Sequence, residues 1–228
     1  MKLLRYFCAF LAVFALLLCP ARAGGEAPLG YVALTFDDGP SPATTARLLE
    51  LLAQREVEAT FFVCGYRLAE LPELAARYAG HEIGIHGYTH AYLHKATLDQ
   101  DRRELEDTRA ELDRFGLTPT LFRAPGGLMS DDLRQAAREA GLPVMLWSVD
   151  PRDWECQDAD TVARRVLDQV QAGDVILMHE LFPSSVQAAG RIIDGLRQRG
   201  LEPVTVSQLA RFYGLELVPG EEYRAFAP

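Results

Sequence analysis

Reactive side chains in this sequence follow short apolar runs. TFDDGP places two adjacent carboxylates, Asp37 and Asp38, directly after the run 31–34, and HGYTH, RAPGG, DPRDW and ILMHE follow later runs. A site that combined carboxylates, imidazoles and a guanidinium could bind a metal ion and transfer protons. The reactive residues of the four later stretches are His86, His90, Arg123, Asp150, Asp153, Trp154 and His179.

The adjacent carboxylates of TFDDGP have two interpretations. Asp-Gly-Pro is ordinary turn chemistry at the end of a strand, where an Asp side chain bonds the backbone. Alternatively, because successive side chains of a strand point to opposite faces, the two acids would have different tasks. One carboxylate would then be a metal ligand, and the other would be free to act as a base.

His86 and His90 are separated by four positions in HGYTH. On a helical turn this spacing places both imidazoles on one face, close enough to bind one metal ion. With one carboxylate of TFDDGP they would form a 2-His-1-carboxylate site with positions open for water. Surface histidines are common, however, and Arg123 could equally form a structural salt bridge or hold a carboxylate base ionised. We assign Trp147 to the core and Trp154 to the mouth of the site.

The predicted strands are seven short apolar runs, at 32–36, 59–64, 82–85, 120–123, 144–148, 175–178 and 203–206. Helical patterns lie between most of them, at 43–54, 97–115 and 184–199, and capping boxes at Thr97 and Ser184 are predicted to start the last two. This alternation predicts parallel β/α units, arranged as a barrel or a doubly wound sheet. In both architectures active sites lie at the carboxyl ends of the strands, where the reactive residues fall.

The composition limits the classes of partner. The chain has 228 residues, enough for one domain with a sizeable core, and a formal net charge of -9. This acidity disfavours nucleic acids and anionic membrane surfaces as partners. No Gly-x-Gly-x-x-Gly stretch follows the first predicted strand and no P-loop lysine is present, so nucleotide binding has no support.

Residues 1–23 are predicted to be a secretory signal peptide. A basic start precedes an apolar run at 6–19, which is too short to be assigned as a membrane span, and an A-x-A pattern ends at Ala23. Lipidation of Cys19 is the alternative. Cleavage after Ala23 would leave a soluble protein outside the cytoplasm, either secreted or in the periplasm or cell wall. We expect a flexible lead at 24–30, one domain at 31–213 and a C-terminal tail at 214–228.

Two cysteines, Cys64 and Cys156, remain after the predicted cleavage. Both follow predicted strands that end near the proposed site, in a compartment that permits disulfides. We therefore hypothesise a bond between them, which requires Cα atoms within about 7 Å. Two thiols are too few for a disulfide framework, and no C-x-x-C metal knuckle is present.

The five motifs, in this order and spacing, resemble those of polysaccharide deacetylases with the NodB homology domain, carbohydrate esterase family 4. The resemblance runs from about residue 31 to residue 213. It implies an α/β fold, a distorted (β/α)7 barrel in a single domain. It also implies a divalent metal, usually zinc or cobalt, and hydrolysis of N-acetyl or O-acetyl groups on sugars.

The resemblance implies a role for each matching residue of the metal site. Asp38, His86 and His90 match the metal ligands. Asp37 matches the general base, and Arg123 matches the arginine that orients it. The residue after His86 is usually Ser or Thr in the family but is glycine here, so a hydroxyl that braces the metal loop is lost.

The resemblance also implies roles in protonation of the leaving group and in substrate binding. His179 matches the catalytic histidine that protonates the leaving group, and Asp153 matches its acidic partner. Leu177 matches a hydrophobic wall beside the acetyl pocket, and Trp154 lies near the mouth of the site. The third motif often carries Tyr before its final glycine, whereas Gly126 stands here. Its backbone N–H could still stabilise an oxyanion, but a side chain that forms one wall of the sugar groove is lost.

The function that follows from the resemblance is metal-dependent removal of N-acetyl groups from N-acetylglucosamine-containing polysaccharide, such as peptidoglycan or chitin-type chains. The alternatives are an O-acetyl xylan esterase, a small-amide hydrolase on the same scaffold, and an inactive glycan-binding relative. A signal peptide disfavours the small-amide hydrolase, and the presence of every matching catalytic residue disfavours the inactive relative.

Overall fold

The structure is a computed structural model, and it describes residues 27–226. The predicted signal peptide, its cleavage after Ala23 and the alternative lipidation of Cys19 lie outside the described residues. Within 27–226, no helix is both long and apolar enough to cross a membrane.

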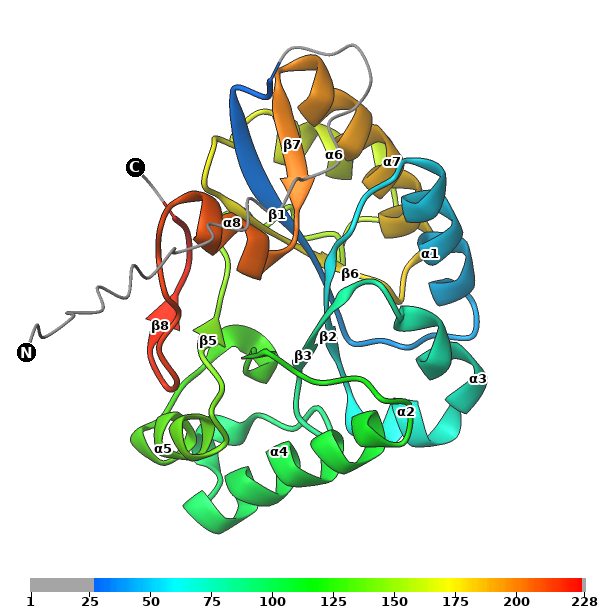
Figure 1. Ribbon diagram of the computed structural model, residues 1–228. Coiled ribbons are helices and arrows are strands. Elements are labelled where there is room, and N and C mark those ends of the chain that lie inside the picture. The colour runs from blue at the N-terminus through cyan, green and yellow to red at the C-terminus, as the bar shows by residue number, and fades with distance from the viewer. Residues whose placement is uncertain (1–26, 227–228) are drawn as a thin grey trace, which may run out of the picture.

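A parallel sheet, curled into a distorted barrel, forms the centre of the molecule (Figure 1). Its path runs β6-β1-β2-β3-β4-β5-β8, and β7 pairs with the first half of β1. A parallel bridge between Val149 and Ile176 joins the chain after β5 to β6 and so closes the ring. The strands are β1 (Gly30–Asp37), β2 (Thr60–Val63), β3 (Glu82–Ile85), β4 (Leu121–Phe122), β5 (Val144–Met145), β6 (Val175–His179), β7 (Leu201–Val204) and β8 (Glu222–Tyr223).

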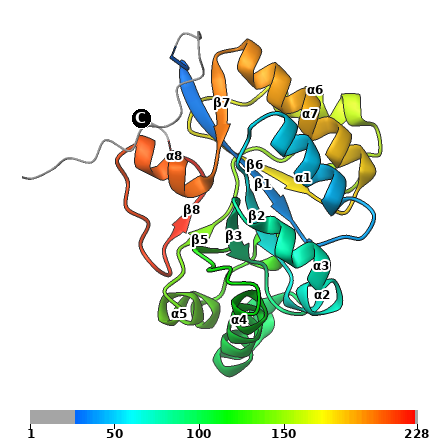
Figure 2. The same ribbon diagram turned by 45° about the vertical axis from the view of Figure 1, so that its right-hand side comes forward.

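Helices cover the outside of this sheet, as the two ribbon views show (Figure 2). The amphipathic α1 buries Leu48, Leu49 and Leu52 against the core. The helices are α1 (Thr45–Gln54), α2 (Gly65–Glu70), α3 (Pro72–Ala75), α4 (Leu98–Asp113), α5 (Asp131–Glu139), α6 (Ala159–Leu167), α7 (Pro183–Gln198) and α8 (Val206–Phe212), with short 3-10 turns η1 (Ala76–Tyr78), η2 (Leu93–Lys95) and η3 (Pro125–Gly127).

The alternation of side chains along β1 separates the core from the site. Val32, Leu34 and Phe36 belong to the large cluster that packs under the helices. On the opposite face, Ala33 joins a second cluster with α8 and Phe226, and Asp37 lies further along that same face. The barrel interior is therefore apolar at one end and carries reactive groups at the carboxyl end of the strands.

Of the two predicted helix starts, one is confirmed and one needs correction. Thr97 caps α4, and its N–H donates to Gln100 Oε1 at 2.9 Å, which confirms that capping box. The box predicted at Ser184 is wrong, because α7 begins one residue earlier at Pro183 with Phe182 at the N-cap and no side-chain cap. Proline suits the first helical position since its fixed φ favours the helix.

The segment expected to be a C-terminal tail is part of the barrel. Its strand β8 pairs with β5, and Phe226 is buried in the second core cluster. At the other end of the fold, Gly30 belongs to β1 rather than to a flexible lead. A two-residue strand is too short for periodicity to detect, so no local pattern predicted β8.

The hypothesised disulfide is wrong, because Cys64 and Cys156 are both free thiols. Cys64 follows β2, whereas Cys156 follows β5, and the strands β3 and β4 lie between them in the sheet. Burial raises the pKa of the Cys64 thiol, so it stays protonated and unreactive.

Candidate metal centre and active site

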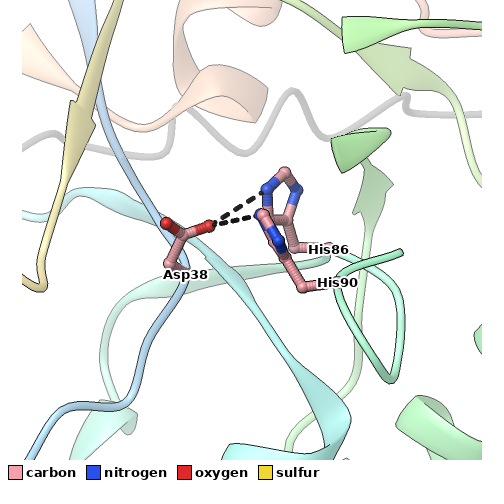
Figure 3. Close-up of side chains that lie close together, drawn as sticks. All are labelled: Asp38, His86 and His90. Carbon is pink, nitrogen blue, oxygen red and sulfur yellow. Dashed lines mark ion pairs between the residues drawn. The ribbon is translucent and has the colours of Figure 1, made fainter. Parts of the chain in front are cut away.

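Asp38, His86 and His90 converge at the carboxyl edge of the sheet (Figure 3). Asp38 Oδ1 lies 3.0 Å from His90 Nε2 and 3.3 Å from His86 Nε2. All three ligand atoms lie within 4.8 Å of one another, so one ion could contact them together. The structure therefore brings together the two histidines of HGYTH and the second acid of TFDDGP.

The donor atoms of this group fit a cation. His86 is buried, and its Nδ1 lies 2.8 Å from the carbonyl oxygen of Arg123, which fixes the proton on Nδ1 and leaves a lone pair on Nε2. Asp38 Oδ1 is buried and accepts no hydrogen bond within residues 27–226. Lone pairs of a carboxylate and an imidazole at such close range repel unless a positive charge lies between them.

Irregular backbone, rather than a helical turn, positions these ligands. His90 has φ of 62° and lies in the loop between β3 and η2, so the predicted helical arrangement of the histidine pair is wrong. Asp38 has φ of 76°, in the left-handed region. This turn brings both acids of TFDDGP to the same imidazole, since Asp37 Oδ2 lies 3.7 Å from His86 Nε2.

Asp37 and Arg123 form a buried ion pair beside the metal ligands. Arg123 Nη1 donates to Asp37 Oδ1 at 2.6 Å and to Thr35 Oγ1 at 2.8 Å. Its other nitrogens donate to the carbonyls of Met145 and Leu146 at 2.9 Å each. Burial lowers the pKa of Arg123 while Asp37 opposes the change, and a guanidinium remains charged at neutral pH. The pair fixes the direction of the Asp37 carboxylate.

His179 faces the site from the neighbouring strand. It ends β6, where it is the register partner of Asp37 on β1. Its Nδ1 lies 2.7 Å from Asp153 Oδ1, and Asp153 Oδ2 accepts from the His179 N–H at 2.8 Å and from Ser185 Oγ at 2.5 Å. Burial disfavours the charged imidazole, but its hydrogen bond to the Asp153 carboxylate and the charge of that group outweigh burial and raise the pKa of His179 to about 9. His179 is therefore a proton donor at neutral pH.

Three further predicted residues lie on the strand and loops that carry these groups. Gly126 lies in η3 with φ of 69°, in the loop that follows Arg123. Leu177 is buried in β6 two residues before His179, on the same side of the strand. Trp154 is 49% exposed, with the Arg152 guanidinium 5.4 Å from its ring centre.

Two other sequence expectations need correction. Asp150 does not join the reactive group, because its Oδ1 accepts from the Arg152 N–H at 2.8 Å in a local turn. Trp147, which we expected in the core, is only partly buried. Its ring lies 5.7 Å from the Arg123 guanidinium and fills the space against Gly127, where a Cβ would come within 2.7 Å of it.

Glu104 is a functional residue that the sequence analysis missed. From α4 its carboxylate accepts the N–H of Tyr88 at 2.6 Å, the N–H of Thr89 at 2.9 Å and the Thr89 hydroxyl at 2.7 Å. It therefore braces the loop that carries His86 and His90, where we expected a loss of support at Gly87. No local signal marks Glu104, because it is one of many acids on a charged helix.

Glu180, next to His179, is a second missed residue. It is fully buried, and its carboxyl group accepts from Tyr78 Oη at 2.6 Å and from Thr45 Oγ1 at 2.5 Å. Gly39 packs directly on it, since a Cβ there would lie 1.4 Å from Glu180 Oε1. Burial raises the pKa of Glu180 to about 7. Glu180 thus supports the turn that follows Asp38.

Comparison with known proteins identifies the family. Residues 24–145 match the family described as polysaccharide deacetylase. The chain belongs to the polysaccharide deacetylase family. This membership confirms the predicted enzyme class, and the curled parallel sheet confirms the predicted fold.

Three relatives illustrate the similarity. The chain is 39% identical over 181 residues to the peptidoglycan-N-acetylmuramic acid deacetylase PdaC of Bacillus subtilis, covering 78% of this chain and 38% of PdaC. It is 36% identical over 188 residues to a peptidoglycan-N-acetylglucosamine deacetylase of Bacillus cereus, covering 79% of this chain and 88% of that enzyme. The structure of a family 4 acetyl xylan esterase from Clostridium thermocellum, in complex with a cobalt ion, matches with a TM-score of 0.81 and 32% identity, covering 87% of this chain and 100% of that one.

Proposed function

We propose that this protein removes N-acetyl groups from N-acetylglucosamine-containing polysaccharide, with a divalent metal held by Asp38, His86 and His90. One observation carries the proposal: the metal-ligand group shares the carboxyl ends of the strands with two separate proton-transfer groups, Asp37 with Arg123 and His179 with Asp153. The Bacillus relatives, which are named as peptidoglycan deacetylases, support this class of substrate.

The metal proposed is zinc, because one carboxylate and two imidazoles with open positions suit it, and cobalt accepts the same ligands. When bound, such an ion polarises the acetyl carbonyl and lowers the pKa of water in the site. The cobalt ion bound to the Clostridium esterase supports a divalent metal of this kind.

Asp37 is proposed as the general base. Its Oδ1 is committed to Arg123, and its Oδ2 points toward His86 and the metal-ligand group, where it can take a proton from water. Arg123, held by two backbone carbonyls, prevents the carboxylate from turning away.

His179 is proposed as the general acid. Deacetylation of an amide must expel an amine, which leaves only when it is protonated. His179 carries the proton at neutral pH because Asp153 accepts from its Nδ1, which leaves the other ring nitrogen to donate. The Gly126 N–H is proposed to stabilise the oxyanion, Leu177 to contact the acetyl methyl group, and Trp154 to contact the sugar chain.

The deciding experiment is acetate release by the zinc-loaded protein, measured side by side on peptidoglycan, chitin oligomers and acetylated xylan. Release from peptidoglycan or chitin oligomers is the expected result. Release from acetylated xylan alone would instead show an O-acetyl xylan esterase. The similarity to the Clostridium enzyme supports this alternative. No release from any of them would indicate an inactive relative.

The site of action is proposed to be outside the cytoplasm, after cleavage of the signal peptide 1–23. The cell-wall substrates named for the Bacillus relatives support this location. The intact mass of the exported protein tests it, because a chain starting at Gly24 is expected and a lipidated Cys19 would contradict it.

A further inference from the structure

The ring of Tyr92 occupies the space in front of Gly126. A Cβ built on Gly126 would lie 2.7 Å from Tyr92 Cε1 and 3.3 Å from Cδ1, so no side chain fits at position 126 while Tyr92 stays in place. Gly126 also has φ of 69°, which favours glycine. The side chain missing from the third motif is thus replaced in space by an aromatic ring from the loop after β3.

Tyr92 is nevertheless not a core residue. It is 64% exposed, although it packs on Gly126 and its ring lies edge-on to the His94 imidazole, with centroids 6.2 Å apart. A tyrosine that served only to cover Gly126 would bury its ring. One face of the ring therefore remains available to a ligand.

Exposed apolar side chains lie on the loops that carry the proposed site. Tyr92, Leu128 (47% exposed) and Trp154 come from the loops after β3, β4 and β5, which also carry His90, Gly126 and Asp153. The other large exposed apolar side chains of residues 27–226 precede β1 or lie in and after α8. Only the carboxyl edge of the barrel thus combines exposed aromatic rings with reactive groups.

We propose that Tyr92 is a specificity-determining residue that forms the aromatic wall of the sugar groove, stacking on a sugar unit next to the one that loses its acetyl group. The inference rests on the proposed function and names its substrate class as a chain of several N-acetylglucosamine units. Sugar rings present C–H faces that pack on aromatic rings, and tyrosine offers such a face at low cost in side-chain entropy.

Binding tests this role separately from catalysis. The parent is the zinc-loaded Asp37→Asn protein, which keeps the metal ligands but lacks the proposed base, and the probe is chitopentaose in isothermal titration calorimetry. Adding Tyr92→Ala should weaken binding about ten-fold, whereas Tyr92→Phe, which keeps the ring, should stay within about three-fold of the parent. Phe212→Ala is the matched control, because Phe212 is an exposed aromatic residue (44%) that stacks on Tyr31 away from the site.

Kinetics of the zinc-loaded enzyme give the second readout. Tyr92→Ala should raise the KM for chitopentaose about ten-fold with little change in kcat. The same variant should lower kcat/KM for 4-nitrophenyl acetate, a substrate without a sugar, much less than it lowers kcat/KM for chitopentaose. Equal losses on both substrates would show that Tyr92 only holds the loop, and unchanged chitopentaose binding would also overturn the inference. If Tyr92→Ala weakens chitopentaose binding but the wild-type enzyme releases no acetate from chitin oligomers or from peptidoglycan, the proposed function fails and the role of Tyr92 in sugar binding stands.

Discussion

Asp37 and Asp38 are neighbours in the chain but have different surroundings. Asp37 is buried, and its Oδ1 lies 2.6 Å from Arg123 Nη1. Asp38 Oδ1 instead lies 3.0 Å from His90 Nε2 and 3.3 Å from His86 Nε2. Identical side chains therefore acquire different chemistry from the groups around them. This difference can be measured by replacing each acid with its neutral isostere.

The two Asn variants should fail in different ways. Asp38→Asn removes a charged ligand, so zinc affinity should fall and excess zinc should restore part of the activity. Asp37→Asn keeps the shape but removes the base, so zinc should still bind while the rate falls by about 10²–10⁴-fold. Metal content and deacetylation rate against added zinc distinguish them. Loss of metal from Asp37→Asn, with retention by Asp38→Asn, would show that the roles are reversed.

The alkaline limb of the pH–rate profile should report His179. An acid catalyst is active while protonated, so activity should fall as pH rises through the pKa of His179, which Asp153 raises to about 9 in the metal-free protein. Asp153→Asn removes the charge that favours the imidazolium, so this limb should move to lower pH. Profiles of kcat/KM on a chitin oligomer measure the shift.

Ser185→Ala is the control for that variant, because it removes one hydrogen bond to Asp153 Oδ2 and leaves the carboxylate charge in place. Its shift should be smaller than that of Asp153→Asn. An alkaline limb that does not move in Asp153→Asn would exclude His179 as the group that titrates there.

At the scale of elements, the sequence predicted the strands well and the loops poorly. Apolar runs located the strands, and the rule that sites lie at carboxyl ends grouped Asp37, Arg123 and His179 correctly. The left-handed φ values of Asp38 and His90 depend on the packing of whole loops, and no local pattern encodes them. Strand alternation alone would have separated the two acids, and helical spacing alone would have misplaced the histidine pair.

The loop between β3 and η2 should depend on its brace from α4. Glu104→Ala leaves the N–H groups of Tyr88 and Thr89 without their acceptor, so the loop should lose its fixed shape. Zinc affinity is expected to fall by about 10–100-fold, the range seen when partners of metal ligands are lost. Competition with a chromogenic chelator measures it.

Glu106→Ala on the same helix provides the comparison, because Glu106 is exposed. It should leave zinc affinity unchanged. If Glu104→Ala and Glu106→Ala bind zinc equally well, the ligand loop holds its shape without Glu104.

At the scale of the whole molecule, two contacts that periodicity could not predict complete the barrel. The bridge between Val149 and Ile176 closes the ring, and the last described residues add β8 and bury Phe226. Both involve pairings of one or two residues between segments far apart in the chain. Such pairings depend on the assembled fold, so the sequence predicted the architecture but not its closure.

The stability of the metal-free protein should decrease as pH rises toward neutrality because of Glu180. Its pKa is about 7 in the folded state, against an ordinary value of 4.5, so the folded state binds this proton more tightly than the unfolded state. The stabilisation is fully present below pH 4.5 and is lost as pH rises through 7, a change of about 3 kcal/mol in the free energy of unfolding.

Glu180→Gln cannot ionise, so urea unfolding of the chelator-treated variant should depend less on pH between 5 and 8. Glu139→Gln is the control, because the pKa of Glu139 is lowered to about 2 by Arg102 and does not change its charge in this window. Parallel pH dependence in wild type and Glu180→Gln would mean that Glu180 is already ionised in the folded barrel.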